Sequence, residues 1–217
     1  EHSIDAKATS AHSPGVCPFP YPPADHTILI NSKPYLILEM IGKGGSSKVY
    51  KVLSGDMRIH ALKRVKVPTS SHSGLSSYAN EIQLLQSLRG RPTIIQLYDA
   101  EVSRSNGTIL ILLEYGDIDL AKLLLRRKGR MLGNNFRRLY WQQMLEAVQT
   151  IHEEKIVHGD LKPANFLHVT GTLKLIDFGI AKAIQADDTT KIFRDSQIGT
   201  PNYMAPEALM AEDDDGD

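Results

Sequence analysis

The sequence predicts an α+β protein of two lobes, a five-stranded antiparallel sheet with one inserted helix followed by a mainly helical part. Segments rich in Ile, Leu and Val, separated by glycine turns, fill the chain up to Gly116. Beyond that residue the apolar positions recur at helical spacing. The length of 217 residues is enough for one large domain or two small lobes with a sizeable core.

Composition narrows the classes of function. Lys plus Arg and Asp plus Glu both total 25, so the net charge is zero and no global field favours direct binding to nucleic acid or to an acidic membrane. No apolar run approaches the roughly 18 residues of a membrane span. The only cysteine, Cys17, cannot form an internal disulfide. We therefore expect a soluble, intracellular protein without a membrane partner.

The strands are predicted in chain order. Residues 1–34, rich in Pro, Ser and His, are expected to form a flexible arm, in which Ile28 to Ile30 has the composition of a short strand. YLILEMIGKGGSSKVYKVL then reads as two strands joined by a glycine turn, and MRIHALKRVKV as a third. A helix follows from Tyr78 to Leu88. IIQLYDAEV and TILILLEY flank SRSNG, whose Asn106-Gly107 suits a hairpin.

Helices are predicted after Gly116. LAKLLLRR is one, and a longer one places five residues on a single face: Phe136, Tyr140, Met144, Ala147 and Ile151. The segment from Glu114 to Asp117 thus joins a lobe of residues 35–116 to a lobe of residues 117–217. A small-molecule ligand most often binds in a cleft of this kind.

The stretch IGKGGSSKV, from Ile41 to Val49, is a candidate phosphate-binding loop. Glycines let backbone amides approach phosphate oxygens that a Cβ would obstruct. A glycine-rich hairpin is often only a turn, so this signal is weak alone. The Walker A alternative is rejected because Ser47 and Val49 stand where Gly and Ser or Thr are needed, and because a strand follows.

Lys63 and Glu81 form a candidate ion pair. Lys63 lies in HALKRV on the third strand, and Glu81 lies on the next helix beside its apolar face. Such a pair can hold the ammonium against phosphate oxygens. Considered alone, each of the two residues would be assigned to a surface ion pair of little energetic value.

VHGDLKPANFLHV, residues 157–169, and LKLIDFGIA supply a reactive cluster. Asp160 can accept or orient the hydroxyl of a nucleophile, and Lys162 can face a transferred phosphoryl group. Asn165 and Asp177 offer oxygen ligands to a hard cation such as Mg²⁺. Separately these residues suit turns and caps. Together they fit phosphoryl transfer, which needs positioning and charge neutralisation more than covalent help.

From Tyr35 to Met210 the sequence resembles the eukaryotic protein kinases. GKGGSSKV matches the glycine loop, HALK the lysine strand, HGDLKPAN the catalytic loop, DFG the metal motif and APE the end of the activation segment. GGSSKV, LLEYGDIDL, DLKPANFL and DSQIGTPNYMAPEA look most like the monopolar spindle kinases, which are dual-specificity enzymes of the spindle assembly checkpoint. The resemblance implies a protein kinase fold, ATP and Mg²⁺, protein substrates, kinetochore proteins as partners, and location in the nucleus at kinetochores.

The resemblance also implies roles for individual residues. Asp160, Lys162, Lys63 and Glu81 would be catalytic, and Asn165 and Asp177 would bind metal. Ile41, Val49, Ala61 and Leu175 would sandwich adenine, with Leu113 as gatekeeper and the backbone from Glu114 to Gly116 as hinge. The implied nucleotide contacts are Ile41, Gly42, Lys43, Gly44, Gly45, Ser46, Ser47, Lys48, Val49, Ala61, Lys63, Leu113, Glu114, Gly116 and Leu175.

Three departures from the family pattern qualify this reading. Ser47 replaces the third loop glycine. Gly159 replaces the arginine that receives the activation-loop phosphate in many kinases, so phosphate on Thr190 is expected to work through other cations or through loop release. The sequence given ends soon after APE, which predicts an incomplete C-terminal lobe. The other cations that could bind phosphate on Thr190 are Lys182, Lys191 and Arg194. The hydroxyl residues of the activation segment, residues 177–207, that could carry phosphate are Thr189, Thr190, Ser196 and Thr200.

The resemblance also implies a second role for Thr200, which is contact with the catalytic aspartate and lysine.

Two alternatives to an active kinase stay open at this point. One is a catalytically impaired, pseudokinase-like interaction module, and the other is a non-kinase ATP-binding module.

Overall fold

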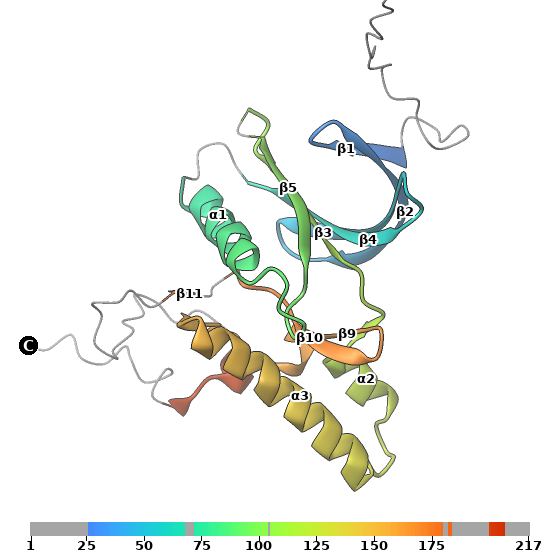
Figure 1. Ribbon diagram of the computed structural model, residues 1–217, viewed down its shortest axis with the longest axis vertical. Helices are drawn as coiled ribbons and strands as arrows, with labels where there is room; N and C mark the ends of the chain where they lie inside the picture. The colour runs from blue at the N-terminus through green and yellow to red at the C-terminus, as the bar shows by residue number, and fades with distance from the viewer. Residues whose placement is uncertain (1–25, 68–71, 104, 180–181, 184–199, 207–217) are drawn as a thin grey trace, which may run out of the picture.

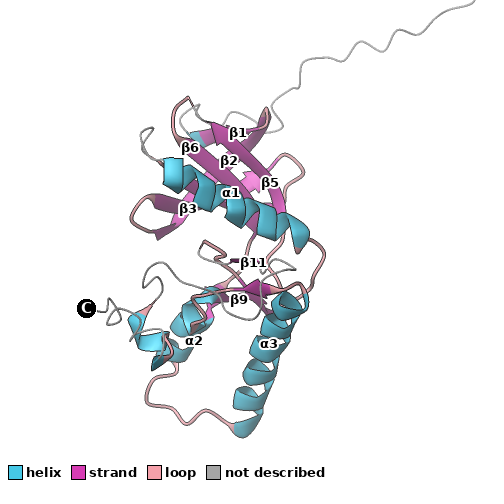
Figure 2. Cartoon of the chain, turned by 90° about the vertical axis from the view of Figure 1, so that its left-hand side faces the viewer, coloured by secondary structure: helices cyan, strands magenta, loops and turns pink. Residues whose placement is uncertain are grey.

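The computed structural model describes residues 26–67, 72–103, 105–179, 182–183 and 200–206. Figure 1 shows a curled sheet and one helix above a group of helices and short strands, and Figure 2 shows the same two lobes from the side. The predicted two-lobed α+β fold is thereby confirmed. No described helix is long and apolar enough to cross a membrane.

The sheet of the N-terminal lobe contains the five predicted strands and also the short strand that was predicted at Ile28 to Ile30. Its six strands lie in the order β1-β2-β3-β4-β6-β5, and every neighbouring pair is antiparallel. The short strand β1 pairs Thr27 with Leu36 and Ile30 with Lys33. The predicted boundary of the arm at residue 34 is therefore corrected, because Asn31 and Ser32 adopt positive φ and turn the chain back into the sheet. The bounds are β1 Thr27–Ile30, β2 Lys33–Lys43, β3 Ser47–Ser54, β4 Ile59–Lys66, β5 Leu97–Ser103 and β6 Thr108–Glu114.

Helix α1, His72–Ser87, crosses one face of this sheet (Figure 2). The apolar residues that recur at helical spacing in this part of the sequence, Ile82, Leu85 and Leu88, are all buried. The predicted hairpin between β5 and β6 is present as well, with Gly107 at a φ of 59°. The segment between α1 and β5 lies at the junction of the lobes, where Ile94 forms a backbone bridge to Leu175.

The C-terminal lobe begins with strand β7, Ile118–Asp119. Helix α2, Leu120–Arg126, follows directly because the Asp119 side chain caps it by accepting a bond of 2.8 Å from the Lys122 amide. Helix α3, Asn134–Glu153, buries Ala147 and Ile151 of its predicted face. The remaining strands are β8 Ile156–Val157, β9 Phe166–Val169, β10 Thr172–Leu175 and β11 Lys182–Ala183, with single turns of 3₁₀ helix at Pro163–Asn165 and Pro201–Tyr203.

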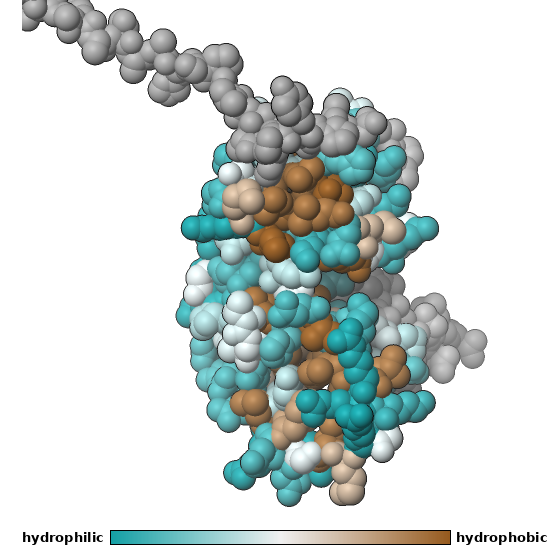
Figure 3. All heavy atoms as spheres, turned by 90° about the vertical axis from the view of Figure 1, so that its right-hand side faces the viewer, coloured by the Kyte–Doolittle hydropathy of each residue, from teal (hydrophilic) through white to brown (hydrophobic). Residues whose placement is uncertain are grey.

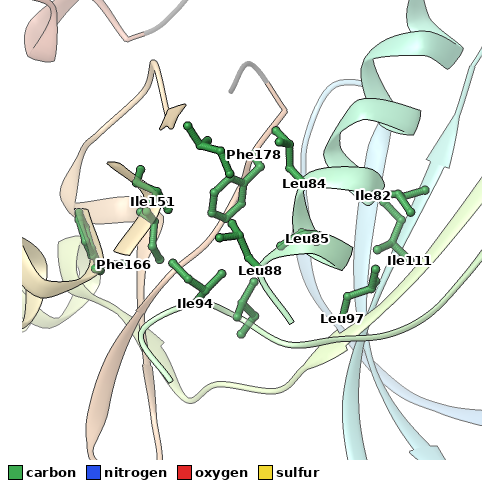
Figure 4. Close-up of a cluster of buried hydrophobic side chains, with 14 of the residues drawn as sticks. Ile82, Leu84, Leu85, Leu88, Ile94, Leu97, Ile111, Ile151, Phe166 and Phe178 are labelled. Atoms are coloured by element: carbon green, nitrogen blue, oxygen red, sulfur yellow. The ribbon is translucent and has the colours of Figure 1, made fainter. Parts of the chain in front are cut away.

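One apolar core joins the two lobes. It contains side chains from α1 and β6 above and from α3, β9 and β10 below. Figure 4 shows Phe178 between Leu84 and Leu88 on one side and Ile151 and Phe166 on the other. Phe178 is fully buried, so the residue before it is held at the junction of the lobes.

A second, smaller core fills the curl of the sheet and includes Ile30, Val52 and Leu62. Part of the outer surface of the N-terminal lobe is apolar. Figure 3 shows apolar side chains gathered on one face of this lobe. Exposed apolar residues of that lobe include Leu29, Leu38, Met40 and Ile59.

Candidate active site

Lys63 of β4 and Glu81 of α1 form the predicted ion pair. The Lys63 Nζ lies 2.7 Å from Glu81 Oε1 and 3.5 Å from Asp177 Oδ1. The Glu81 side chain is only 2% exposed, so the pair is not a surface ion pair. Burial opposes the charge on Lys63, but the carboxylates of Glu81 and Asp177 outweigh it and raise the lysine pKa. Lys63 therefore stays a cation.

Asp177 is positioned by its backbone and by its neighbour. Its φ is 65°, a left-handed conformation that aspartate tolerates better than most residues. The buried ring of Phe178 fixes the next position. The Asp177 carboxylate is consequently turned toward Lys63 while half of its side chain remains open to solvent.

Asp160, Lys162 and Asn165 converge in the loop between β8 and β9. Lys162 Nζ donates to Asp160 Oδ2 over 2.6 Å. The side-chain Nδ2 of Asn165 donates to the backbone carbonyl of Asp160 over 2.8 Å and to Asp160 Oδ2 over 3.3 Å. The 3₁₀ turn at Pro163–Asn165 produces this geometry, because it folds Asn165 back onto the start of the loop.

Thr200 closes the same cluster from 40 positions along the chain. Its hydroxyl donates to Asp160 Oδ1 over 2.7 Å, and its amide donates to the same oxygen over 3.0 Å. Lys162 Nζ donates to the Thr200 hydroxyl over 2.6 Å. The predicted contact of Thr200 with the aspartate and lysine is thus confirmed. Burial alone would raise the pKa of Asp160, but hydrogen bonds from Lys162 and Thr200 outweigh burial and hold it below its ordinary value.

His158 anchors the loop and was not predicted as a site residue. The Asp160 amide donates to His158 Nδ1 over 3.3 Å, so the ring proton lies on Nε2, which donates to the Ile176 carbonyl over 3.0 Å. Burial lowers the pKa of His158 and keeps the ring neutral. This histidine therefore ties the segment of Asp160 to the segment of Asp177. The signal in the sequence that could have identified His158 was its position two residues before Asp160.

Asn165 and Asp177 are brought near each other through the chain between them. The Ile176 amide donates to the Asn165 carbonyl over 2.9 Å. Among the described residues, the Asn165 side chain is hydrogen-bonded only through its Nδ2, which leaves its Oδ1 as an acceptor. Asp177 presents a half-exposed carboxylate. Amide and carboxylate oxygens are the ligands that hard divalent cations take, so these residues fit Mg²⁺.

The predicted adenine contacts do not all lie in the cleft. Ala61 pairs with Leu113 and Val49 with Lys63 on adjacent strands, which places these residues together on the lysine face of the sheet. Leu175 is different. It is fully buried, and its backbone bonds to Thr93 and Ile95 hold it in the core between the lobes. The prediction that Leu175 contacts adenine is therefore wrong.

Leu167 lies against the hinge. It belongs to β9, is partly exposed, and pairs with Asp119 just after the junction. A Cβ added to Gly116 would come within 2.5 Å of the Leu167 side chain and 2.9 Å of the His168 carbonyl. Gly116 is thus required by this close approach. The signal in the sequence was strand alternation, since the neighbouring Phe166 is buried and Leu167 must point the other way.

The hinge is also fixed by an ion pair that was not predicted. Lys174 Nζ lies 2.7 Å from Glu114 Oε2, and both side chains are largely buried. The Glu114 amide donates to the Gln96 carbonyl over 2.9 Å. The Glu114 side chain is therefore occupied by Lys174 and is not available to a ligand.

The glycine loop forms the turn between β2 and β3. Gly44 donates its amide to the Ser47 carbonyl over 2.8 Å, and a Cβ on Gly44 would lie 2.9 Å from Ser47 Oγ. Gly45 would accept a Cβ without contact. Ser46 Oγ lies 3.4 Å from the Tyr78 hydroxyl on α1. Lys43 and Lys48 are paired directly across the two strands, and the exposed Ile41 and the partly exposed Gly42 precede them.

Gly159 has a physical reason that the sequence did not reveal. Its φ is 83°, in the left-handed region where a side chain is strained. The glycine where arginine was expected therefore serves the backbone of this loop. Thr189, Thr190, Ser196, Lys191 and Arg194 lie outside the described residues, and of Lys182 only the backbone is described, as part of β11.

Comparisons with known proteins point in one direction. Residues 35–216 match the family model of the protein kinase domain. The chain is 61% identical over 183 residues to the probable serine/threonine-protein kinase mps1 of Dictyostelium discoideum, covering 84% of this chain and 18% of that protein. It is 54% identical over 176 residues to the serine/threonine-protein kinase mph1 of Schizosaccharomyces pombe, covering 81% and 26%.

A mammalian relative shows the same likeness. The dual specificity protein kinase TTK of Mus musculus is 48% identical over 183 residues, covering 84% of this chain and 21% of that protein. The chain thus spans between a sixth and about a quarter of the length of these three curated relatives.

Proposed function

The chain belongs to the protein kinase domain family, and from this premise we propose that it transfers the γ-phosphoryl group of ATP to hydroxyl side chains of proteins. The observation that carries the proposal is the meeting of two clusters. Lys63, Glu81 and Asp177 form one, and Asp160, Lys162 and Thr200 form the other. His158 links the backbones of the two.

The aspartate of the second cluster is the residue that would meet the nucleophile. Its carboxylate is kept ionised by Lys162 and Thr200, so it can accept a hydrogen bond from a substrate hydroxyl and orient that oxygen toward phosphorus. Lys162 lies 2.6 Å from this carboxylate and supplies positive charge next to the attacking oxygen. Charge neutralisation and alignment are what this reaction needs from a protein.

The first cluster would hold the nucleotide phosphates. Lys63 remains a cation and is oriented by the buried Glu81, so its ammonium is pre-positioned toward phosphate oxygens. Asn165 Oδ1 and the Asp177 carboxylate would hold Mg²⁺, which when bound neutralises charge on the phosphates. The glycine loop between β2 and β3 would cover the phosphates with backbone amides.

For the adenine ring we propose a site between Val49, Ala61 and Leu167, with Leu113 behind it. Leu167 replaces the buried Leu175 in this assignment because it is partly exposed and lies against the hinge. The backbone from Glu114 to Gly116 would bind the polar edge of the ring.

The substrate class follows from the relatives. Two are named serine/threonine-protein kinases and one a dual specificity protein kinase, which supports Ser and Thr as acceptors, with Tyr as an additional acceptor. The resemblance to the monopolar spindle kinases supports a role in the spindle assembly checkpoint and chromosome segregation. On the same basis we propose kinetochore proteins as partners and the nucleus and kinetochore as location.

A phosphotransfer assay tests the proposal. The protein is incubated with γ-labelled ATP, Mg²⁺ and a mixed protein substrate, and the labelled amino acids are identified after hydrolysis. Label on Ser and Thr that is lost in Asp160→Asn is the expected result. A well-folded protein that binds ATP but labels no substrate would instead be a nucleotide-binding interaction module.

A further inference from the structure

A row of like charges crosses three neighbouring strands at the glycine-loop end of the sheet. Lys43 of β2 lies directly opposite Lys48 of β3, and Lys48 lies directly opposite Arg64 of β4. Lys66 follows two positions along β4 and so lies on the same face as Arg64. Like charges directly opposite each other destabilise a sheet, so this arrangement costs stability unless an anion is present.

This face is not the one that carries the proposed nucleotide site. Side chains alternate along a strand, and Arg64 adjoins Lys63 and Val65, which point to the opposite side. On the Arg64 side, β4 contributes Leu62 to the small core inside the curl of the sheet. The four cations therefore line the open end of that curl.

The cations surround a hollow. Its volume is about 240 Å³, and its walls are the loop from Lys43 to Lys48 together with Tyr50, Arg64 and Lys66. Drug-sized ligands take about 300–1,000 Å³. The hollow is therefore of a size for one phosphate group or one phosphorylated side chain.

The cations are unpaired within the part of the chain that the structure describes. None of the four forms a salt bridge with another described residue. Glu101 of β5, an acid on this face, is separated from Arg64 by Leu110 of β6 and accepts a hydrogen bond from the Asn31 amide. Arg64 is half-buried, and its Nε is buried without a hydrogen-bond partner among the described residues. Three exposed lysines alone would be a solvated surface, but a buried unpaired guanidinium nitrogen calls for an acceptor.

We propose that this hollow, the outer loop site, binds a phosphate group. The planar guanidinium of Arg64 can donate to two oxygens of one phosphate, and Lys43, Lys48 and Lys66 surround it with charge that matches a dianion. The group can belong to a phosphorylated side chain or to free inorganic phosphate. Bound phosphate would join β2, β3 and β4 and thereby restrain the glycine loop, and its binding would not require the charged groups of the cleft.

Isothermal titration of the full chain at 0.15 M salt tests the site. The probes are inorganic phosphate, a Gly-Gly-phosphoserine-Gly-Gly peptide and the same peptide without phosphate. We expect one site for the phosphorylated probes and none for the unphosphorylated peptide. Arg64→Gln should weaken binding at least about tenfold, because a hydrogen bond between charged groups is lost. Lys43→Gln, an independent variant, should weaken it by a smaller factor.

Two controls separate this site from others. Lys33→Gln removes an exposed lysine at the far end of β2 and should leave affinity unchanged. Lys63→Met removes the cation of the cleft and should also leave it unchanged. Should Lys63→Met fail to fold, Lys63→Met combined with Glu81→Gln takes its place. Slower hydrogen exchange of the amides of residues 43–48 on adding the tighter probe is a further expected result.

The source of the phosphate follows from the ratio of affinities. Tighter binding of the phosphopeptide assigns a phosphorylated side chain, and tighter binding of inorganic phosphate assigns the free ion. Equal binding by Arg64→Gln, Lys43→Gln and wild type would overturn the proposal. So would loss of binding in Lys63→Met alone, or Arg64-dependent binding of a DNA duplex by a protein that takes neither phosphate nor phosphopeptide.

Discussion

Replacing Thr200 by Val removes one hydroxyl from the centre of the site and keeps the shape of the side chain. That hydroxyl donates to Asp160 Oδ1 over 2.7 Å and accepts from Lys162 Nζ over 2.6 Å. The Thr200 amide and Lys162 continue to donate to Asp160 in the variant. The change therefore loosens the alignment of acid and cation without unpairing either charge.

The size of the effect follows from the two hydrogen bonds that are lost, each of which involves a charged group. A hydrogen bond to a charged group contributes about 1.5–3 kcal/mol, which corresponds to roughly 10–150-fold in rate if all of it acts in the transition state. We predict that kcat for phosphotransfer falls at least about tenfold in Thr200→Val. Thr200→Ser keeps the hydroxyl and loses only the methyl group, so it should stay near wild type.

Steady-state phosphotransfer over a range of pH measures both the rate and its cause. The Thr200 hydrogen bonds help hold the pKa of Asp160 below its ordinary value, so removing the hydroxyl should move the acid limb of the kcat profile to higher pH. Equal kcat values for Thr200→Val and Thr200→Ser, with unshifted acid limbs, would refute the reasoning.

Three further predictions concern stability, each measured by urea unfolding. Glu81→Gln should lower the free energy of unfolding by about 3 kcal/mol, since it leaves Lys63 without its buried partner; an unchanged value would mean that the pair is not formed in solution. Gly116→Ala should cost about 1–3 kcal/mol through its clash with Leu167, and Leu167→Ala should remove part of that cost, whereas strict additivity would exclude the contact. Burial holds the pKa of His158 below its ordinary 6.5, so the unfolded chain binds a proton that the folded chain does not, and stability should fall as pH drops below about 6.5; His158→Gln should flatten part of that slope.

Much of the site could be predicted because its residues lie on elements with strong local patterns. Lys63 follows Ala61 and Leu62 on a strand, and Glu81 adjoins the apolar face of a helix, so their meeting needed only that the helix cover the sheet. Asp160, Lys162 and Asn165 lie within six positions, and a single 3₁₀ turn brings them together.

The features that were missed depend on packing between distant segments. Gly116 is required by Leu167, about fifty positions away, and no local pattern records that approach. Leu175 has the same apolar character as Leu167, and only the folded structure shows, through its complete burial and its bridge to Ile94, that it belongs to the core. The role of Gly159 rests on a backbone angle, which a family comparison of side chains could not supply.

Transfer of the γ-phosphoryl group in a single turnover tests the central claim most directly. Wild type and Asp160→Asn are each saturated with γ-labelled ATP and Mg²⁺, nucleotide occupancy is matched by equilibrium binding, and protein substrate is then added in excess. Our account predicts equal ATP binding and transfer of label by wild type only, because Asp160 lies beside Lys162 and Thr200 rather than beside Lys63. Transfer by Asp160→Asn at the wild-type rate would contradict it.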